Sequence, residues 1–216
     1  MDAELFPRSR GEIAPGAVHL PDWLDAGRQR ELLAACREWA CPPAGLRTVR
    51  TPGGGTMTAR QVCLGLHWYP YGYARTVVDG DGAPVKPFPA WLGDLGRRAV
   101  ADTLGTGAAA DAAYDIALIN FYDADARMGM HRDSDERTDA PVVSLSLGDT
   151  CVFRFGNTES RARPYTDLEL CSGDLFVFGG PSRFAYHGVP RVHPGTGPPE
   201  LGLTGRLNIT LRVSGR

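Results

Sequence analysis

Hydrophobic residues recur at helical spacing in two segments of the first half of the chain. Between Asp22 and Trp39 the apolar positions repeat every three to four residues, and Asp22 can cap the first turn. We therefore predict a helix from about Asp22 to Trp39. A second helix is predicted from Pro89 to about Leu104, where Gly105 ends it.

From Tyr114 onward the spacing of apolar positions changes to the period of two that is typical of strands, and Gly or Pro separates the runs. The predicted strands are Asp115–Tyr122, Val142–Leu147, Cys151–Phe155, Thr166–Leu170, Asp174–Phe178 and Arg206–Val213. Such a series of short strands predicts an all-β sandwich or jelly roll.

The remaining segments carry turn residues. Residues 1–20 read as irregular, and residues 45–90 are rich in Gly, Pro and aromatic residues, which predicts hairpins and loops with exposed aromatics. The TPGGG stretch at 51–55 lacks the GK[ST] ending of a phosphate-binding loop, so we interpret it as a flexible turn.

Composition narrows the class of protein. The 216 residues, 43% hydrophobic and 22% charged, suit one globular domain, residues 1–216. The formal net charge of −2 means that any nucleic-acid binding must use a local patch; Arg127, Arg132, Arg137, Arg161 and Arg163 can form one, or be scattered solvated arginines.

The chain carries no sign of export. Its first residues have no apolar core of a signal peptide, and no run of 18 apolar residues predicts a membrane span. The five cysteines are scattered, without a C-x-x-C pair, which favours reduced structural thiols. We therefore expect a cytoplasmic protein with no membrane partner, and a monomer.

The last strand predicts a face with donor groups. Because side chains alternate along a strand, Leu207, Ile209 and Leu211 share one face, and Arg206, Asn208, Thr210 and Arg212 share the other. Asn120 and Tyr122 share a face of an earlier strand. Together these groups can hold a small dicarboxylate through charge-assisted hydrogen bonds. The alternative is that the arginines lie on an exposed sheet face.

A metal site is the second candidate for chemistry. His131 and Asp133 form an H-x-D pair whose side chains project to one side of an extended chain. Two histidines and one carboxylate make the facial triad of non-haem Fe(II) enzymes. Of the five histidines, His187 follows a predicted strand and a turn that can return it to this pair.

These motifs together resemble the AlkB family of Fe(II)- and 2-oxoglutarate-dependent dioxygenases, which repair alkylated nucleic-acid bases. The motifs that carry the resemblance are N-x-Y at 120–122, H-x-D-x-D at 131–135, VVSLSLG at 142–148, FRFG at 153–156, GDLFVFGGPSRFAYHGV at 173–189 and R-x-N-x-x-x-R at 206–212. The resemblance covers about residues 45–213 and is looser before residue 110.

The resemblance implies a fold. It is α+β but mainly β, with a double-stranded β-helix (jelly-roll) core at residues 113–216. Residues 1–112 would supply N-terminal helices and a β-hairpin lid, at about 45–90, that recognises the nucleotide.

The resemblance also implies roles for residues. His131, Asp133 and His187 match the Fe(II) ligands. Arg206 matches the arginine near the 1-carboxylate of 2-oxoglutarate and Arg212 the one that clamps the distal carboxylate. The remaining co-substrate contacts implied are Asn120, Tyr122 and Asn208.

For the substrate, the implied contacts are less closely defined. Trp68 or Tyr69 matches an aromatic that stacks on the flipped base, and Tyr71 or Tyr73 a tyrosine that contacts phosphate or base. Asp135 and Arg161 match residues around the base, although Asp135 can instead cap a turn. Thr51 and Met57 complete the candidate substrate contacts.

The implied reaction is oxidative demethylation of bases such as 1-methyladenine and 3-methylcytosine in DNA, with RNA left open. Decarboxylation of 2-oxoglutarate to succinate and CO₂, with O₂ as oxidant, accompanies hydroxylation of the methyl group and release of formaldehyde. A ring-alkylated base is cationic and pairs poorly, which favours flipping and stacking on an aromatic ring. We expect a single-stranded substrate.

Two alternatives remain open. The chain can be a 2-oxoglutarate dioxygenase that acts on a modified tRNA base, a protein side chain or a small molecule. It can also be a non-catalytic metal-binding jelly roll or a sensor of 2-oxoglutarate.

Overall fold

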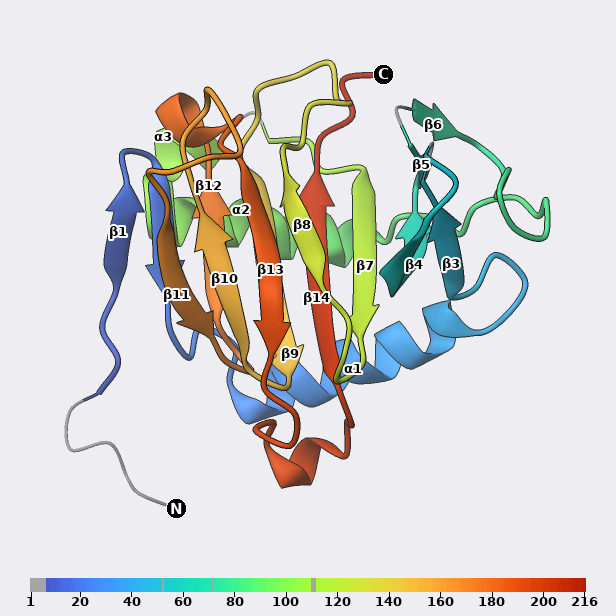
Figure 1. The fold of residues 1–216 in the computed structure, drawn as a ribbon, viewed down its shortest axis with the longest axis horizontal. Helices are drawn as coiled ribbons and strands as arrows, with labels where there is room; N and C mark the ends of the chain where they lie inside the picture. The colour runs from blue at the N-terminus through green and yellow to red at the C-terminus, as the bar shows by residue number, and fades with distance from the viewer. Residues whose placement is uncertain (1–6, 52, 71, 110–111) are drawn as a thin grey trace.

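The computed structural model describes residues 7–51, 53–70, 72–109 and 112–216. Its β-strands form three sheets (Figure 1). The strands are β1 (Gly11–Ala14), β2 (Ala17–Leu20), β3 (Arg47–Arg50), β4 (Thr56–Leu64), β5 (His67–Tyr69), β6 (Gly72–Ala74), β7 (Ile116–Tyr122), β8 (Met128–His131), β9 (Val142–Gly148), β10 (Cys151–Phe155), β11 (Thr166–Leu170), β12 (Leu175–Phe178), β13 (His187–Val192) and β14 (Arg206–Arg212).

The sheets are mainly antiparallel. The large sheet has the order β1-β2-β12-β9-β14-β7-β4-β3, the small sheet has the order β11-β10-β13-β8, and β5 and β6 form a separate hairpin. The helices are α1 (Ala26–Ala40), α2 (Ala90–Leu104) and α3 (Thr106–Ala109), with 3-10 turns at Gly180–Ser182 and Pro199–Leu201. The structure is thus mainly β, as predicted.

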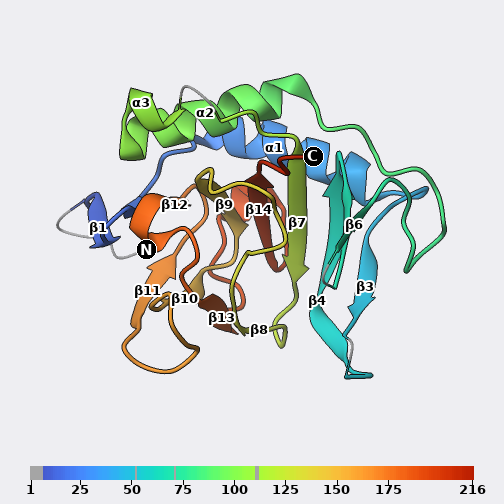
Figure 2. The same cartoon turned by 90° about the horizontal axis from the view of Figure 1, so that it is seen from above.

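Three layers are stacked: the helices cover one face of the large sheet and the small sheet covers the other (Figure 2). One apolar core, which includes Leu207, Ile209 and Leu211, fills the space between the helices and the large sheet. A second core, rich in Phe, lies between the two sheets. The opposite face of β14, with its two arginines, therefore faces the interior between the sheets.

The sequence predicted most of these elements. The six predicted strands correspond to β7, β9, β10, β11, β12 and β14 within a residue or two at their ends, and α2 begins one residue after Pro89. The strands β8 and β13 were not predicted, because Gly129, Gly188 and Pro190 interrupt their short apolar pattern.

The start of the first helix was predicted wrongly. α1 begins at Ala26, and the side chain of Asp25 caps it by accepting a hydrogen bond from the backbone N–H of Arg28. Asp22 has a positive φ of 54° and lies before the helix. Its backbone N–H donates to the buried carboxylate of Asp174, so a tertiary contact rather than a helix turn uses this residue.

Two other segments are more regular than expected. Residues 11–20, expected to be irregular, form the β1–β2 hairpin, and β2 pairs with β12 through four residue pairs. In the segment 45–90, β3 and β4 extend the large sheet, and the β5–β6 hairpin stands beside them (Figures 1 and 2). Backbone pairing with a sheet edge stabilises both segments, and local spacing does not reveal such pairing.

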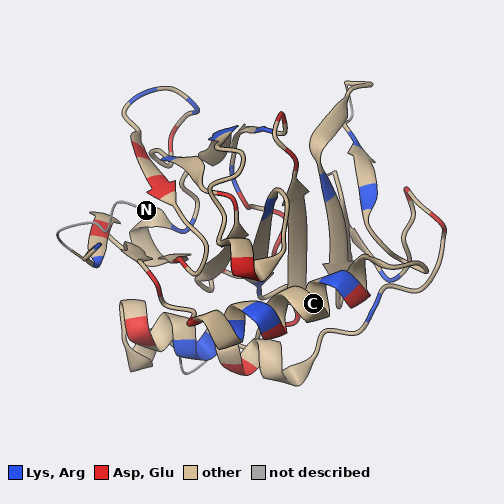
Figure 3. Cartoon of the chain, turned by 90° about the horizontal axis from the view of Figure 1, so that it is seen from below, with Lys and Arg blue, Asp and Glu red and all other residues tan. Residues whose placement is uncertain are grey.

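The cysteines agree with expectation. All five cysteines are free thiols. Thr51 and residues 53–55 lie in the turn between β3 and β4, with Gly54 at a φ of 82°. Among the described helices, none is long and apolar enough to cross a membrane. Basic and acidic positions are interspersed along the helices in Figure 3, in keeping with the low net charge.

Candidate active site

Two histidines and an aspartate meet at one point between the sheets. His131 ends β8 and His187 begins β13, and the two residues are direct partners in the antiparallel ladder. Their rings lie 4.5 Å apart between centroids. Asp133 follows two residues after His131, and the candidate ligand atoms of all three residues lie within 4.8 Å of one another. The convergence predicted from the sequence is confirmed.

The hydrogen bonds of these residues fit a metal ion. His131 Nδ1 lies 2.9 Å from the carbonyl oxygen of Gly129, and His187 Nδ1 lies 3.0 Å from that of Ala185. A carbonyl accepts from a protonated Nδ1, which leaves Nε2 with a free lone pair. Asp133 Oδ2 is buried and has no hydrogen-bond partner among the described residues. A cation here would satisfy that oxygen.

Electrostatics keep His187 and Asp133 in their ligating forms. Burial, together with the neighbouring His131, lowers the pKa of His187 to about 4. Burial alone would raise the pKa of Asp133, but the charges of Arg212 and of the two histidines outweigh it and bring this pKa to about 2. Near neutral pH the site therefore offers a neutral imidazole and an ionised carboxylate, as a divalent metal requires.

Both arginines of β14 are buried between the sheets, with 1% of Arg206 and 7% of Arg212 exposed, so the exposed-face alternative is wrong. Arg212 Nη2 lies 2.6 Å from Asp133 Oδ1. Arg206 lies six residues earlier on the strand and donates to the backbone oxygens of Asp149 and Leu170 and to Ser146 Oγ. Arg212, and not Arg206, thus lies at the candidate metal ligand.

The other predicted co-substrate contacts line the same interior. Asn120 and Asn208 are direct partners in the β7–β14 ladder, so their side chains lie on the same face. Asn120 Oδ1 accepts from Gln61 Nε2, and Asn208 Nδ2 donates to Ser144 Oγ. Tyr122 pairs with Arg206 in the same ladder and is buried. The Nε atoms of both arginines are buried and without a hydrogen-bond partner within the described ranges, which leaves donors for an anionic ligand.

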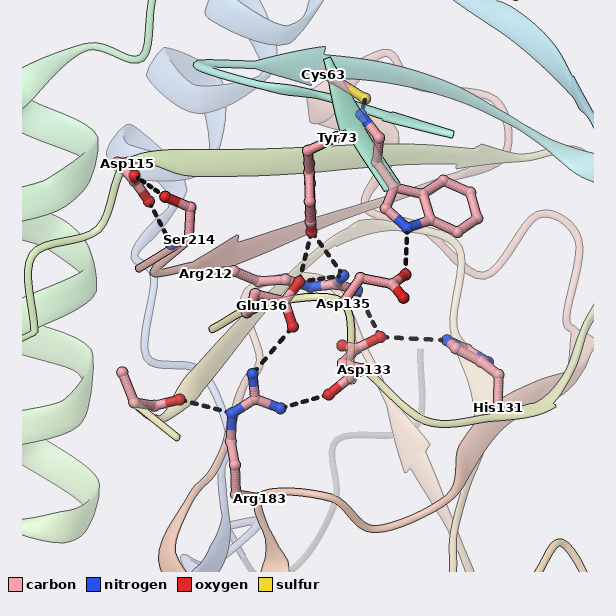
Figure 4. A network of polar contacts seen from close by, with 12 residues as sticks. Cys63, Tyr73, Asp115, His131, Asp133, Asp135, Glu136, Arg183, Arg212 and Ser214 are labelled. Carbon is pink, nitrogen blue, oxygen red and sulfur yellow. Dashed lines mark hydrogen bonds and ion pairs between the residues drawn. The ribbon is translucent and has the colours of Figure 1, made fainter. Parts of the chain in front are cut away.

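The sequence analysis missed two buried charged residues at this site. Glu136 Oε1 accepts from Arg212 Nη1 at 3.1 Å and from the Tyr73 hydroxyl at 2.5 Å. Glu136 Oε2 accepts from Arg183 Nη2, and Arg183 Nη1 donates to the backbone oxygen of Asp133 (Figure 4). Arg183 lies inside the motif at 173–189 and Glu136 directly follows the H-x-D-x-D motif at 131–135, but no spacing rule separated them from their solvated neighbours.

The β5–β6 hairpin contacts the site through two aromatic residues. Trp68 Nε1 donates to Asp135 Oδ2 at 2.8 Å. The hydroxyl of Tyr73 donates to Glu136 Oε1 (Figure 4). The hairpin is thus tied to the segment that carries Asp133. His67, buried in the same hairpin, bonds to Asp79 and packs against Tyr69.

The remaining candidate substrate residues lie further from this network. Thr51 closes the β3–β4 turn by bonding to Gly55, and Met57 is half-buried in β4. Arg161 lies in the loop between β10 and β11 and is exposed. The other four arginines of the candidate phosphate patch are also exposed. Tyr71 lies outside the described residues.

Comparison with known proteins agrees with this geometry. Residues 16–212 match the 2OG-Fe(II) oxygenase superfamily. The chain is 37% identical over 202 residues to the Caulobacter vibrioides "Alpha-ketoglutarate-dependent dioxygenase AlkB homolog", covering 93% of this chain and 88% of that protein. It superposes on the solved structure of OsALKBH1 with a TM-score of 0.82 at 30% identity, covering 94% of this chain and 100% of the other.

Other relatives are longer. The chain is 33% identical over 220 residues to the Arabidopsis thaliana "DNA N(6)-methyladenine demethylase ALKBH1D", covering 93% of this chain but only 50% of that protein. It is 40% identical over 92 residues to the Schizosaccharomyces pombe "tRNA demethylase abh1", covering 42% of this chain and 30% of that protein.

Proposed function

We propose, since the chain belongs to the AlkB family within the 2OG-Fe(II) oxygenase superfamily, that it oxidatively demethylates N-alkylated bases of the 1-methyladenine and 3-methylcytosine type in nucleic acid. The observation that carries this proposal is the convergence of His131, Asp133 and His187 beside a buried arginine. A base demethylase needs both a metal and a nearby cationic site for its co-substrate.

The core is proposed to be a double-stranded β-helix. From β7 to β14 the chain crosses repeatedly between the sheets, with β7, β9, β12 and β14 in the large sheet and β8, β10, β11 and β13 in the small sheet. This wrapping supports a jelly roll, and it positions the ligands on the facing ends of β8 and β13.

Fe(II) would be held by His131, Asp133 and His187, and 2-oxoglutarate by the donors of β7 and β14. The contact of Arg212 with Asp133 leads us to propose Arg212 for the carboxylate near the metal and Arg206 for the distal carboxylate, the reverse of the roles expected from the sequence. When bound, Fe(II), 2-oxoglutarate and O₂ supply the oxidising chemistry that hydroxylates the methyl group and yields succinate, CO₂ and formaldehyde. The chain itself supplies orientation through side chains that are buried, among them Asp133, His187 and both arginines.

The base is proposed to lie between the hairpin and the metal centre. Trp68 offers an indole face for a cationic base, which is worth about 0.5–2 kcal/mol. Asp135 already accepts the Trp68 N–H, but a carboxylate has further lone pairs for the exocyclic amine of the base. The surrounding exposed arginines are suited to phosphate contacts.

The test uses the purified protein with Fe(II), 2-oxoglutarate and O₂ on an oligonucleotide that contains 1-methyladenine. We expect conversion to adenine with an equal amount of formaldehyde. If succinate forms while methylated DNA and RNA stay unchanged, the base-repair function is refuted and only the dioxygenase activity stands.

A second candidate substrate is a methylated tRNA base, which the similarity to the fission-yeast tRNA demethylase favours. Single-stranded DNA, duplex DNA and tRNA carrying the same methylated base would be compared in parallel. We place single-stranded DNA first, because an unpaired base is the least costly to flip. A kcat/KM highest on tRNA would instead select the second candidate.

A further inference from the structure

Glu136 is a buried carboxylate that joins four separate segments of the fold. It lies in the segment after β8, and its partners are Tyr73 on β6, Arg212 at the end of β14 and Arg183 after the 3-10 turn Gly180–Ser182. Its side chain is fully buried, so these three donors replace water entirely. Figure 4 shows Tyr73 reaching from the hairpin to the point where Glu136 and Arg212 meet.

The geometry gives one oxygen of Glu136 two tasks. Oε1 accepts both the Tyr73 hydroxyl and Arg212 Nη1, while Oε2 accepts Arg183. The Arg212 guanidinium is thereby fixed between Glu136 on one side and Asp133 on the other. If the Tyr73 hydroxyl moves away from Oε1, Glu136 loses one of its hydrogen-bond donors and the network that holds Arg212 changes. The position of the hairpin and the orientation of Arg212 therefore depend on each other.

We propose that Glu136 is a positioning residue that couples the β5–β6 hairpin to the binding of 2-oxoglutarate at Arg212. The inference rests on the proposed function for the identity of the co-substrate. Hairpin docking through Tyr73 prepares the guanidinium for the carboxylate, and by thermodynamic reciprocity the bound carboxylate stabilises the docked hairpin. Because the hairpin also carries Trp68, the base-stacking surface is assembled together with the co-substrate site.

The coupling is tested without nucleic acid and without turnover. Tyr73→Phe removes only the hydroxyl and leaves Arg212, Asp133 and Glu136 in place. Its control is Tyr114→Phe, since the Tyr114 hydroxyl is similarly buried but donates to Pro141 O, outside this network. The Kd for 2-oxoglutarate is measured by calorimetry with Mn²⁺ as the metal. A hydrogen bond to a charged group is worth enough to predict a Kd raised about tenfold in Tyr73→Phe, and an unchanged Kd in the control.

A second readout follows the hairpin directly. Arg75, exposed just after β6, is a trypsin site. We expect 2-oxoglutarate with Mn²⁺ to slow cleavage there in the wild-type protein and in Tyr114→Phe, but not in Tyr73→Phe. A residue that merely packs the hairpin would change the cleavage rate equally with and without the co-substrate.

Glu136→Gln completes a double-mutant cycle with Tyr73→Phe. Its control is Asp174→Asn, another buried carboxylate paired with an arginine. We expect Glu136→Gln to weaken 2-oxoglutarate binding and to make the added Tyr73→Phe change nearly silent. Additive effects, or a wild-type Kd in Tyr73→Phe, would overturn the coupling; if Glu136→Gln does not fold, the Tyr73→Phe result decides alone.

Turnover of the methylated oligonucleotide by the wild-type protein is measured in the same preparations. Coupled binding without turnover would refute the proposed function and leave the inference intact. Turnover with a Kd for 2-oxoglutarate that does not respond to Tyr73→Phe would support the proposed function and refute the coupling.

Discussion

The two arginines of β14 are predicted to differ sharply in what their loss does to the protein. Arg212 is paired with two carboxylates, Asp133 and Glu136. Arg206 is equally buried, but it donates to two backbone oxygens and a hydroxyl, and within the described part of the chain it forms no ion pair. Arg206 is thus a buried cation without a described carboxylate partner, whereas Arg212 neutralises the charges of Asp133 and Glu136.

The magnitudes follow from this difference. Arg212→Met leaves two buried carboxylates short of a partner, and breaking a buried pair costs about 3–5 kcal/mol. For a chain of this length each kcal/mol lowers Tm by about 2–4 °C, so we expect a fall of roughly 6–20 °C. Arg206→Met removes an uncompensated buried charge, so the Tm of the ligand-free protein should equal or exceed that of the wild type.

Ligand binding shows the other half of the contrast. If Arg206 clamps the distal carboxylate, its removal costs about 2–5 kcal/mol of 2-oxoglutarate affinity, or a Kd raised roughly 30-fold or more. Thermal unfolding is followed by circular dichroism with Mn²⁺, with and without 2-oxoglutarate. The wild type should gain Tm with the ligand, and Arg206→Met should not.

Two outcomes would refute this reasoning. A Tm for ligand-free Arg206→Met as low as that of Arg212→Met would mean that Arg206 is already neutralised in the free protein. A normal rise in Tm with 2-oxoglutarate in Arg206→Met would mean that the distal carboxylate binds elsewhere. Leu207→Met, on the opposite face of β14, serves as the control for changes in strand packing.

Two further predictions concern residues away from β14. Trp68→Ala should raise the KM for a methylated oligonucleotide by roughly 5-fold or more, because stacking contributes about 1–3 kcal/mol per base; a KM equal to that of Tyr69→Ala would assign no special role to the indole. Burial alone would raise the pKa of Asp174, but hydrogen bonds from His19 and Arg8 outweigh it and hold that pKa below its usual range. The ionised Asp174 carboxylate therefore stabilises the protein fully above about pH 4, and this stabilisation is lost as the pH falls further. Asp174→Asn should accordingly flatten the acid limb of a plot of unfolding free energy against pH. An acid limb as steep as that of the wild type would contradict this.

The sequence was sufficient for the features that depend on local periodicity. The alternation in 206–212 predicted three apolar residues on one face of the strand and two arginines on the other, as the structure confirms. It left open whether the arginine face is exposed, and the tertiary structure decided that it is buried. The H-x-D spacing brought His131 and Asp133 to one side, and the turn before His187 indicated its return. The predicted helix start at Asp22 failed because a distant carboxylate, Asp174, uses that residue.

The network around Glu136 lay beyond the reach of sequence spacing. Its members come from residues 73, 136, 183 and 212, and nothing in the local pattern of each segment says which buried charge will neutralise another. The same is true of the β1–β2 and β3–β4 hairpins at the sheet edges, because β2 pairs with β12 and β4 pairs with β7, both distant in sequence.

Side-chain periodicity, turn residues and the order of motifs thus determined the mainly β class, the face of each strand and the candidate metal ligands, because these depend on neighbours along the chain. Tertiary structure alone decided which arginine meets Asp133 and that Glu136 joins the hairpin to it. The physical reason is that strand register and the neutralisation of buried charge depend on which segments pack together. A charged side chain needs a partner of opposite charge only when folding removes it from water, and that burial is a property of the tertiary structure.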